Sequence, residues 1–209
     1  MTISIVTCCY SPARLNDLFD LLQSVRSQQY ASIETVVVVD RNVSLVAPIR
    51  EYLSAAGHAG CTVLLNESGR GVSAARNLGI AHANGEIVAF VDDDAVLMPG
   101  WADATASAYE SDASVIGVTG PVLPLWQGEG MSWWPREFYW LFSCTYWDWT
   151  EPREVRNGYG VNLSFRREAF ERCGLFETAL GVNDGGGPGW QGPGGEEPDF
   201  SVRVTASTG

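Results

Sequence analysis

Three consecutive aspartates, Asp92, Asp93 and Asp94, are the residues of this chain whose type and spacing best suit chemistry. They directly follow residues 87–91, an uncharged apolar run of strand length. Open α/β sheets bind ligands outside the carboxyl ends of their strands, so this position favours a binding role. Crowded carboxylates repel one another unless a hard cation lies between them, and Mg²⁺ or Mn²⁺ prefers such oxygen ligands. The pattern indicates either a divalent metal site that holds a phosphate-bearing ligand or an acidic turn that caps the strand.

The elements that must position these aspartates alternate between strands and helices. The β-branched run at residues 35–39 is too dense for burial on one side only, which is typical of a central parallel strand. Alternating strands and helices predict βαβ units and a parallel or mostly parallel sheet. We expect strands at residues 3–7, 35–39, 62–65, 87–91 and 114–119, helices at 15–25, 46–56 and 73–83, and a turn, a strand and a helix within 156–172.

Composition and charge narrow the class of protein. A chain of 209 residues with 45% hydrophobic residues is long enough to bury the core of a single domain. The formal net charge of −12 disfavours nucleic acid as a partner. All 13 basic residues are arginine, which excludes a P-loop lysine and a Schiff-base lysine. Five cysteines without a CxxC pair, no signal peptide, and no apolar run of about 20 residues together predict a cytoplasmic protein.

Two segments of unusual composition follow the predicted sheet strands. Residues 126–149 hold ten of the 23 aromatic residues of the chain. Such a segment can stack on sugar rings, settle at a membrane surface, or form a compact hydrophobic cap over the core. Residues 183–195 are rich in glycine and predict a mobile loop. The last residues, VRVTASTG, end within a predicted helix, so we expect the chain to be truncated at its C-terminus.

Four features now coincide: Asp40 at a strand end, the segment RGVSAARN, the three aspartates, and GGEEPD near the C-terminus. Together they resemble the family 2 glycosyltransferases, the inverting enzymes of the nucleotide-diphospho-sugar transferase (GT-A) fold. The most specific match is RGVSAARNLGIAHANGEIVAFVDDDAVLMPGW, and NGYGVNLSFRREAFERCGLFE and GGEEPDFSVRV are also similar. The resemblance implies a three-layer α/β/α sandwich with a mostly parallel central sheet. It also implies a nucleotide-binding half at about residues 1–120 and an acceptor-binding half at about 121–209.

The resemblance also implies how the donor is held. The three aspartates occupy the family's Asp-X-Asp position, so Asp94 would ligate Mn²⁺ or Mg²⁺ directly. Asp92 would face the ribose or a metal-bound water and complete the metal site, and Asp93 would belong to the same donor-binding segment. The donor itself is implied to be a nucleotide-diphospho-sugar, with a UDP-sugar as the expectation.

Four further positions match donor-binding residues of the family. Tyr10 matches the aromatic residue that stacks on the nucleobase, and Asp40 matches the aspartate that hydrogen-bonds it. Arg76 lies where the family places an arginine beside the phosphates or the base; the alternative is a solvated helix arginine. Gly71 would let the loop backbone approach the donor closely.

The segment Glu196-Glu197 occupies the position of the family's catalytic base. The family usually shows Glu-Asp there, and the match gives the general base to Glu197, with Glu196 beside it. The alternative is an acidic first turn that stabilises its helix through the helix dipole, with Pro198 at a first-turn position. Asp199 and Arg203 have the i,i+4 spacing of a surface ion pair.

The implied activity is metal-dependent transfer of a sugar to an acceptor hydroxyl with inversion at the anomeric carbon. The acceptor is expected to be a glycan or a lipid-linked sugar, with peripheral contact of residues 126–149 at the inner face of the cell membrane. Two alternatives stay open: a sugar nucleotidyltransferase, and a non-catalytic nucleotide-sugar-binding fragment. A dehydrogenase is disfavoured because no GxGxxG follows any predicted strand.

Overall fold

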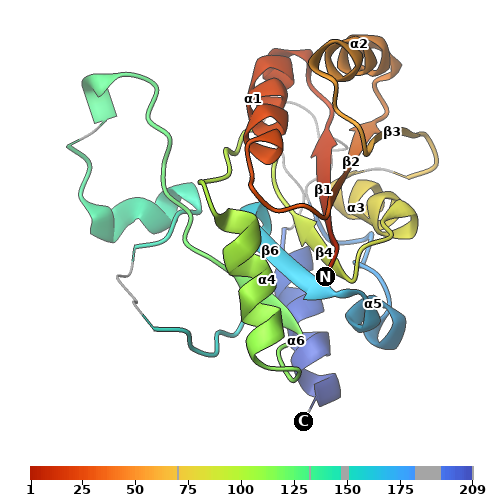
Figure 1. Ribbon diagram of the computed structural model, residues 1–209. Coiled ribbons are helices and arrows are strands. Elements are labelled where there is room, and N and C mark those ends of the chain that lie inside the picture. The colour runs from red at the N-terminus through yellow and green to blue at the C-terminus, as the bar shows by residue number, and fades with distance from the viewer. Residues whose placement is uncertain (70, 132, 147–150, 182–193, 209) are drawn as a thin grey trace.

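The computed structural model describes residues 1–69, 71–131, 133–146, 151–181 and 194–208. These residues form one six-stranded sheet in the order β3-β2-β1-β4-β6-β5 (Figure 1). The first four strands of this order run parallel, whereas β6 is antiparallel to both of its neighbours. The prediction of a mostly parallel sheet is therefore confirmed. The strands are β1 (Ile3–Cys9), β2 (Ile33–Asp40), β3 (Cys61–Asn66), β4 (Ile87–Phe90), β5 (Gly117–Thr119) and β6 (Leu163–Arg166).

Helices cover both faces of the sheet. One buried cluster joins the sheet to α1 (Leu15–Arg26), α2 (Val46–Ala56) and α4 (Trp101–Ser111). A second cluster on the opposite face joins it to α3 (Gly71–His82), α5 (Arg167–Cys173) and α6 (Glu196–Thr208). This is the predicted three-layer α/β/α sandwich.

The alternation of side chains along β1 explains how one strand serves both layers. Ile3 and Ile5 belong to the first cluster, and Val6 belongs to the second. Helix α3 lies especially close to the sheet, because a Cβ atom built on Gly79 would overlap Cγ1 of Val6. Helix α3 packs against β1 and β2, and Arg76 on it contacts Asp92, which lies after β4.

The element boundaries differ from the predictions in a few places. The strand expected at 114–119 begins only at Gly117, and the helix expected at 73–83 begins at Gly71. Helix α4 was not predicted, because its alternating small residues give a weak helical pattern. Most of the glycine-rich loop expected at 183–195 lies outside the described residues.

All five cysteines are free. None of the helices formed by the described residues has the length and apolar character needed to cross a bilayer.

The aromatic segment does not cap the core. Residues 123–144, which we call the aromatic arm, leave the sheet after β5 and project from the body of the molecule (Figure 1). The arm contains the short helices η3 (Glu129–Met131) and η4 (Arg136–Phe142). Its described rings pack mainly on one another, as in Trp126 against Phe142 with centroids 5.6 Å apart. For the described part of residues 126–149, the hypothesis of a cap over the core is therefore wrong.

Candidate active site

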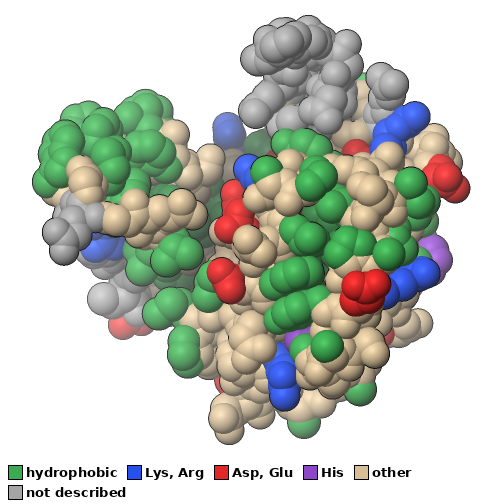
Figure 2. Space-filling model, turned by 90° about the horizontal axis from the view of Figure 1, so that it is seen from above, with side chains coloured by type: hydrophobic (Ala, Val, Ile, Leu, Met, Phe, Trp, Pro, Cys, Tyr) green, Lys and Arg blue, Asp and Glu red, His purple; other side chains and the backbone are tan. Residues whose placement is uncertain are grey.

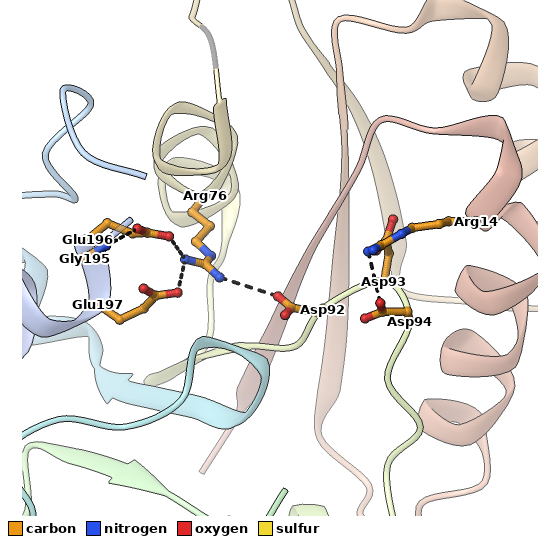
Figure 3. A network of polar contacts seen from close by, with 8 residues as sticks. All are labelled: Arg14, Arg76, Asp92, Asp93, Asp94, Gly195, Glu196 and Glu197. Atoms are coloured by element: carbon orange, nitrogen blue, oxygen red, sulfur yellow. Dashed lines mark hydrogen bonds and ion pairs between the residues drawn. The ribbon is translucent and has the colours of Figure 1, made fainter. Parts of the chain in front are cut away.

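An acidic cluster forms at the carboxyl edge of the sheet from three separate parts of the chain (Figure 3). The three aspartates follow β4, Arg76 projects from α3, and the two glutamates begin α6. Arg76 lies between the glutamates and the aspartates, and Arg14 approaches the aspartates from the other side (Figure 3). The structure thus brings together residues that lie more than 100 positions apart in the chain, as the paired Arg76 and Glu196 show.

Arg76 is the centre of this cluster. It is only 5% exposed, and its guanidinium contacts the rings of Phe90 and Phe176, each with the centroid 5.8 Å away. Its Nη1 donates to Glu196 Oε1 over 3.0 Å and to Glu197 Oε1 over 2.7 Å. Its Nη2 lies 3.5 Å from Asp92 Oδ1. The interpretation of this residue as a solvated helix arginine is therefore wrong.

Arg14 holds the other two aspartates and was not identified from the sequence. It ends the short helix η1 (Pro12–Arg14), which directly follows β1. Its Nη1 lies 2.9 Å from Asp93 Oδ1 and 3.1 Å from Asp94 Oδ2. Arg14 could have been identified only from the parallel pairing of β1 with β4, which places the loops after both strands at one edge of the sheet.

Burial and mutual repulsion shift the ionisation of these acids. Burial raises the pKa of Asp93 to about 6, and the hydrogen bond from Arg14 opposes that rise. Burial also raises the pKa of Glu196, and the neighbouring Glu197 carboxylate raises it further. Although its side chain is half-exposed, surrounding protein atoms displace part of the water around Asp92 and raise its pKa, against the attraction of Arg76. The second oxygen of Asp93, Oδ2, is buried without a hydrogen-bond partner among the described residues. At the carboxyl edge of the sheet, the arginines thus do not fully neutralise the acidic side chains.

The residues expected to bind the nucleobase lie at the same edge, after β1 and β2. Asp40 ends β2, and its Oδ1 accepts a 2.7 Å hydrogen bond from Asn66 Nδ2 at the end of β3. Tyr10 follows β1 with 49% of its surface exposed, and Asn42 Nδ2 donates to its carbonyl oxygen over 3.0 Å. Gly71 begins α3 with a φ of 83°, a conformation that suits glycine. The described geometry leaves the ring of Tyr10 accessible to a ligand.

The carboxylate oxygens of the aspartates are suitable ligands for a hard divalent cation that also binds phosphate. The side chains of Asp92 and Asp94 are each 46% exposed at the strand end. Among the described residues, no three acidic, imidazole or thiol side chains converge to form a complete metal cage. Mg²⁺ ordinarily takes only one or two carboxylates from the protein and completes its shell with water and substrate phosphates. Two half-exposed carboxylates match that requirement.

A glycine residue lies next to the glutamates of the cluster. Gly160, the first residue of η5 (Gly160–Asn162), lies against Glu197 and Arg76. A Cβ atom built on Gly160 would overlap Glu197 Oε1 and lie 2.9 Å from Arg76 Nη2. Helix α6 also carries the ion pair expected from its spacing, with Arg203 Nη2 2.8 Å from Asp199 Oδ2.

Comparison with known proteins shows the family to which this chain belongs. The family model described as Glycosyl transferase family 2 matches residues 4–174. The chain belongs to this family. The chain is 35% identical over 183 residues to the Glucosyl-dolichyl phosphate glucuronosyltransferase of Haloferax volcanii, covering 87% of this chain and 58% of that protein. It is 29% identical over 145 residues to Succinoglycan biosynthesis protein ExoM of Rhizobium meliloti, covering 66% of this chain and 40% of that one.

Solved structures of glycosyltransferases share the fold of this family 2 member. The mannosyltransferase PcManGT from Pyrobaculum calidifontis, in complex with GDP-Man and Mn²⁺, superposes with a TM-score of 0.65 at 24% identity over 87% of this chain and 49% of that one. S. aureus TarS 1-349 in complex with UDP-GlcNAc gives 0.63 at 17% identity over 98% and 53%. The chain thus spans about half the length of these relatives.

Proposed function

We propose that this chain provides the donor site and the catalytic base of a glycosyltransferase that moves a sugar from a nucleotide-diphospho-sugar to an acceptor hydroxyl with inversion. The observation that carries the proposal is the cluster in which Arg76 joins Asp92, after β4, to Glu197, at the start of α6. An exposed metal-binding edge and a carboxylate base within one cluster are what this reaction requires. The relatives support it, because their names include a glucuronosyltransferase and a mannosyltransferase with bound GDP-Man.

In this proposal the aspartates bind the donor diphosphate through a divalent cation. Asp94 and Asp92 would hold Mn²⁺ or Mg²⁺, which when bound would neutralise charge on the leaving diphosphate. Asp93, buried and bonded to Arg14, fixes the backbone between the two ligands. Tyr10 and Asp40 receive the nucleobase at the ends of β1 and β2, and Gly71 allows the donor to approach the first turn of α3.

Glu197 acts as the general base in this proposal. Its side chain is 17% exposed, whereas that of Glu196 is 5% exposed, so Glu197 is the more accessible to an acceptor. It takes the proton from the acceptor hydroxyl as the oxygen attacks the anomeric carbon opposite the leaving group. Attack from that side inverts the anomeric configuration. Glu196 is held beside it by the same Arg76 nitrogen.

The donor site is tested by calorimetric titration of UDP and of GDP, with and without Mn²⁺, into the chain and its Asp94→Ala variant. We expect one nucleotide, UDP, to bind only with Mn²⁺ and to lose that binding in Asp94→Ala. Asp103→Ala, on the exposed side of α4, is the matched control and should bind as the unaltered chain does. Equal binding by Asp94→Ala, or binding that ignores Mn²⁺, would contradict the proposed metal site.

The base is tested by the Glu197→Gln variant with a UDP-sugar that the first experiment selects. We expect transfer to fall by about 10²–10⁴-fold, the usual worth of a positioned general base, while UDP affinity stays the same. Glu196→Gln should affect transfer less, because Glu196 is the more buried of the two. Full activity in Glu197→Gln would assign the base to another residue.

We also propose that the acceptor is lipid-linked and that the aromatic arm contacts the membrane that holds it. The arm exposes large apolar side chains to solvent, and Figure 2 shows them gathered apart from the body of the molecule. Trp133 is 68% exposed, Trp140 55% and Leu141 52%. Such amphipathic aromatic surfaces bind at the headgroup region of bilayers.

Vesicle flotation tests this contact. Because the chain carries a net charge of −12, neutral phosphatidylcholine vesicles avoid repulsion from anionic lipid. We expect the chain to float with these vesicles and the triple variant Trp133→Ser, Trp140→Ser, Leu141→Ser to remain in the unbound fraction. Equal flotation of both proteins would contradict membrane binding through the arm.

A further inference from the structure

We propose that Gly160 is a positioning residue that, together with Arg76, fixes the carboxylate of Glu197 for proton transfer. The inference rests on the proposed function, in which Glu197 is the base. It assigns a role to a backbone position that carries no reactive group.

The carboxylate of Glu197 has two close neighbours. Arg76 Nη1 donates to its Oε1 over 2.7 Å. Beside the same oxygen, the bare Cα of Gly160 leaves space that a larger residue would fill, since a Cβ there would overlap Oε1 and lie 2.8 Å from Cδ of Glu197 and 2.9 Å from Nη2 of Arg76. The lack of a side chain at position 160 therefore leaves the space that the carboxylate of Glu197 occupies.

The contacts around Arg76 hold its guanidinium in place. Its guanidinium is buried between Phe90 and Phe176 and is shared by Glu196 and Asp92. Glu197, by contrast, has a partly exposed side chain whose end can rotate away. A methyl group at position 160 would therefore displace mainly the end of Glu197, and Nη2 of Arg76 would move by only a few tenths of an ångström. Gly160 does not have a positive φ, so alanine is compatible with its backbone.

Displacement of a base by about 1 Å lowers the rate of a positioned reaction by up to 10²-fold. We therefore expect Gly160→Ala to lower kcat at least tenfold. The KM for the nucleotide sugar should change less than twofold, because the donor binds at the aspartates. The melting temperature should stay close to that of the unaltered chain, since only the ends of the Glu197 and Arg76 side chains have to move.

Gly158→Ala is the matched control in the same segment. Its Cβ would lie 2.6 Å from Cβ of Thr119 and 2.7 Å from Cδ1 of Leu163, and these atoms belong to the sheet rather than to the acidic cluster. We expect this variant to lower the melting temperature and to keep kcat within about twofold at a temperature where it is folded. The two glycine variants should thus show opposite patterns.

A double-mutant cycle with Glu197→Ala completes the test. In the Glu197→Ala background, Gly160→Ala should change neither the residual rate nor the urea midpoint, because the group that it displaces is gone. A loss of kcat in that background equal to the loss in the unaltered chain, or a loss in donor affinity instead of kcat, would overturn the proposal. If the unaltered chain transfers no sugar, the proposed function fails. If it transfers sugar and Gly160→Ala keeps the full kcat, only the role given to Gly160 fails.

Discussion

At the scale of single residues, the charges of the site do not balance. The cluster in Figure 3 contains two arginines and five acidic side chains, so its ionised form carries an excess of three negative charges. Each arginine is shared by at least two carboxylates. Because repulsion between carboxylates at short range is costly when water is partly excluded, the cluster suits a ligand that brings positive charge. A divalent cation supplies it in the form that a diphosphate also requires.

Arg14 illustrates how this balance supports the fold. Replacing Arg14 by alanine leaves Oδ1 of the buried Asp93 without its 2.9 Å partner. We expect the free energy of unfolding to fall by about 2 kcal/mol, the cost of an unsatisfied buried charged group. Adding Asp93→Asn removes the unpaired charge, so the double variant should recover part of that loss. Urea unfolding measures both, and a double variant less stable than Arg14→Ala would contradict the explanation.

The sequence predicted the acidic residues of the site better than their partners. The aspartates were found because they follow an apolar strand, and the glutamates because they match a family motif. Arg14 and Gly160 have no local signature. Arg14 matters because β1 pairs with β4, and Gly160 matters because η5 lies beside the first turn of α6. Such contacts between distant segments follow from the assembled sheet and its layers, which periodicity does not specify.

At the scale of elements, the contact of α3 with β1 determines where Arg76 lies. In an isolated helix, Gly79→Ala would stabilise by about 1 kcal/mol through helix propensity. Here a Cβ would overlap Val6 Cγ1 and lie 3.4 Å from Val38 Cγ2, so α3 must move away from the sheet. We expect a net destabilisation of about 1–3 kcal/mol, measured by urea unfolding. Stabilisation by this variant would show that α3 is not held closely against β1.

A second element-level contact joins β2 to the turn before β4, and it depends on pH. Burial tends to raise the pKa of Glu34, but hydrogen bonds from Ser4 and from Asn84 and Gly85 outweigh it and lower the pKa. A lowered folded-state pKa contributes stability above the unfolded value of about 4.5, and this stability is lost as the pH falls through the folded value.

We therefore expect Glu34→Gln to be less stable than the unaltered chain at pH 7, by about 1.5 kcal/mol. The difference should shrink as the pH falls below about 4.5. Urea midpoints from pH 7 to pH 3 measure this difference, in which the other carboxylates cancel. A difference that stays constant with pH would mean that the charge of Glu34 is not what stabilises the turn.

Elements with strong periodicity were predicted and weaker ones were not. The Val-rich β2 and the apolar β4 are largely buried, as their runs of apolar residues predicted. The antiparallel direction of β6 was not predicted, because a short run of residues does not show which way it pairs. Helix α4 was missed because small residues dominate the face that it buries, namely Ala102, Thr105 and Ala106.

At the scale of the whole molecule, the sheet and the aromatic arm are separate packing units. The described rings of the arm contact one another, as Trp133 contacts Trp134 with centroids 5.4 Å apart. The triple serine variant of Trp133, Trp140 and Leu141 should therefore leave the unfolding of the sheet unchanged within about 0.5 kcal/mol. Far-UV circular dichroism in urea measures this. A larger loss of stability would show that the arm is part of the core.

The two ends of the arm are joined by hydrogen bonds close to the sheet. Thr145 N donates to the carbonyl oxygen of Val122 over 2.8 Å, and Val122 N donates to Thr145 Oγ1 over 3.2 Å. Just below, Thr119 of β5 pairs with Leu163 of β6. The two ends of the excursion are thus neighbours in the folded chain, and changing the length of such a loop costs little free energy. In the proposed function, a descendant of this chain could exchange the whole excursion for another of different length and chemistry, and so change its acceptor while keeping the proposed donor site.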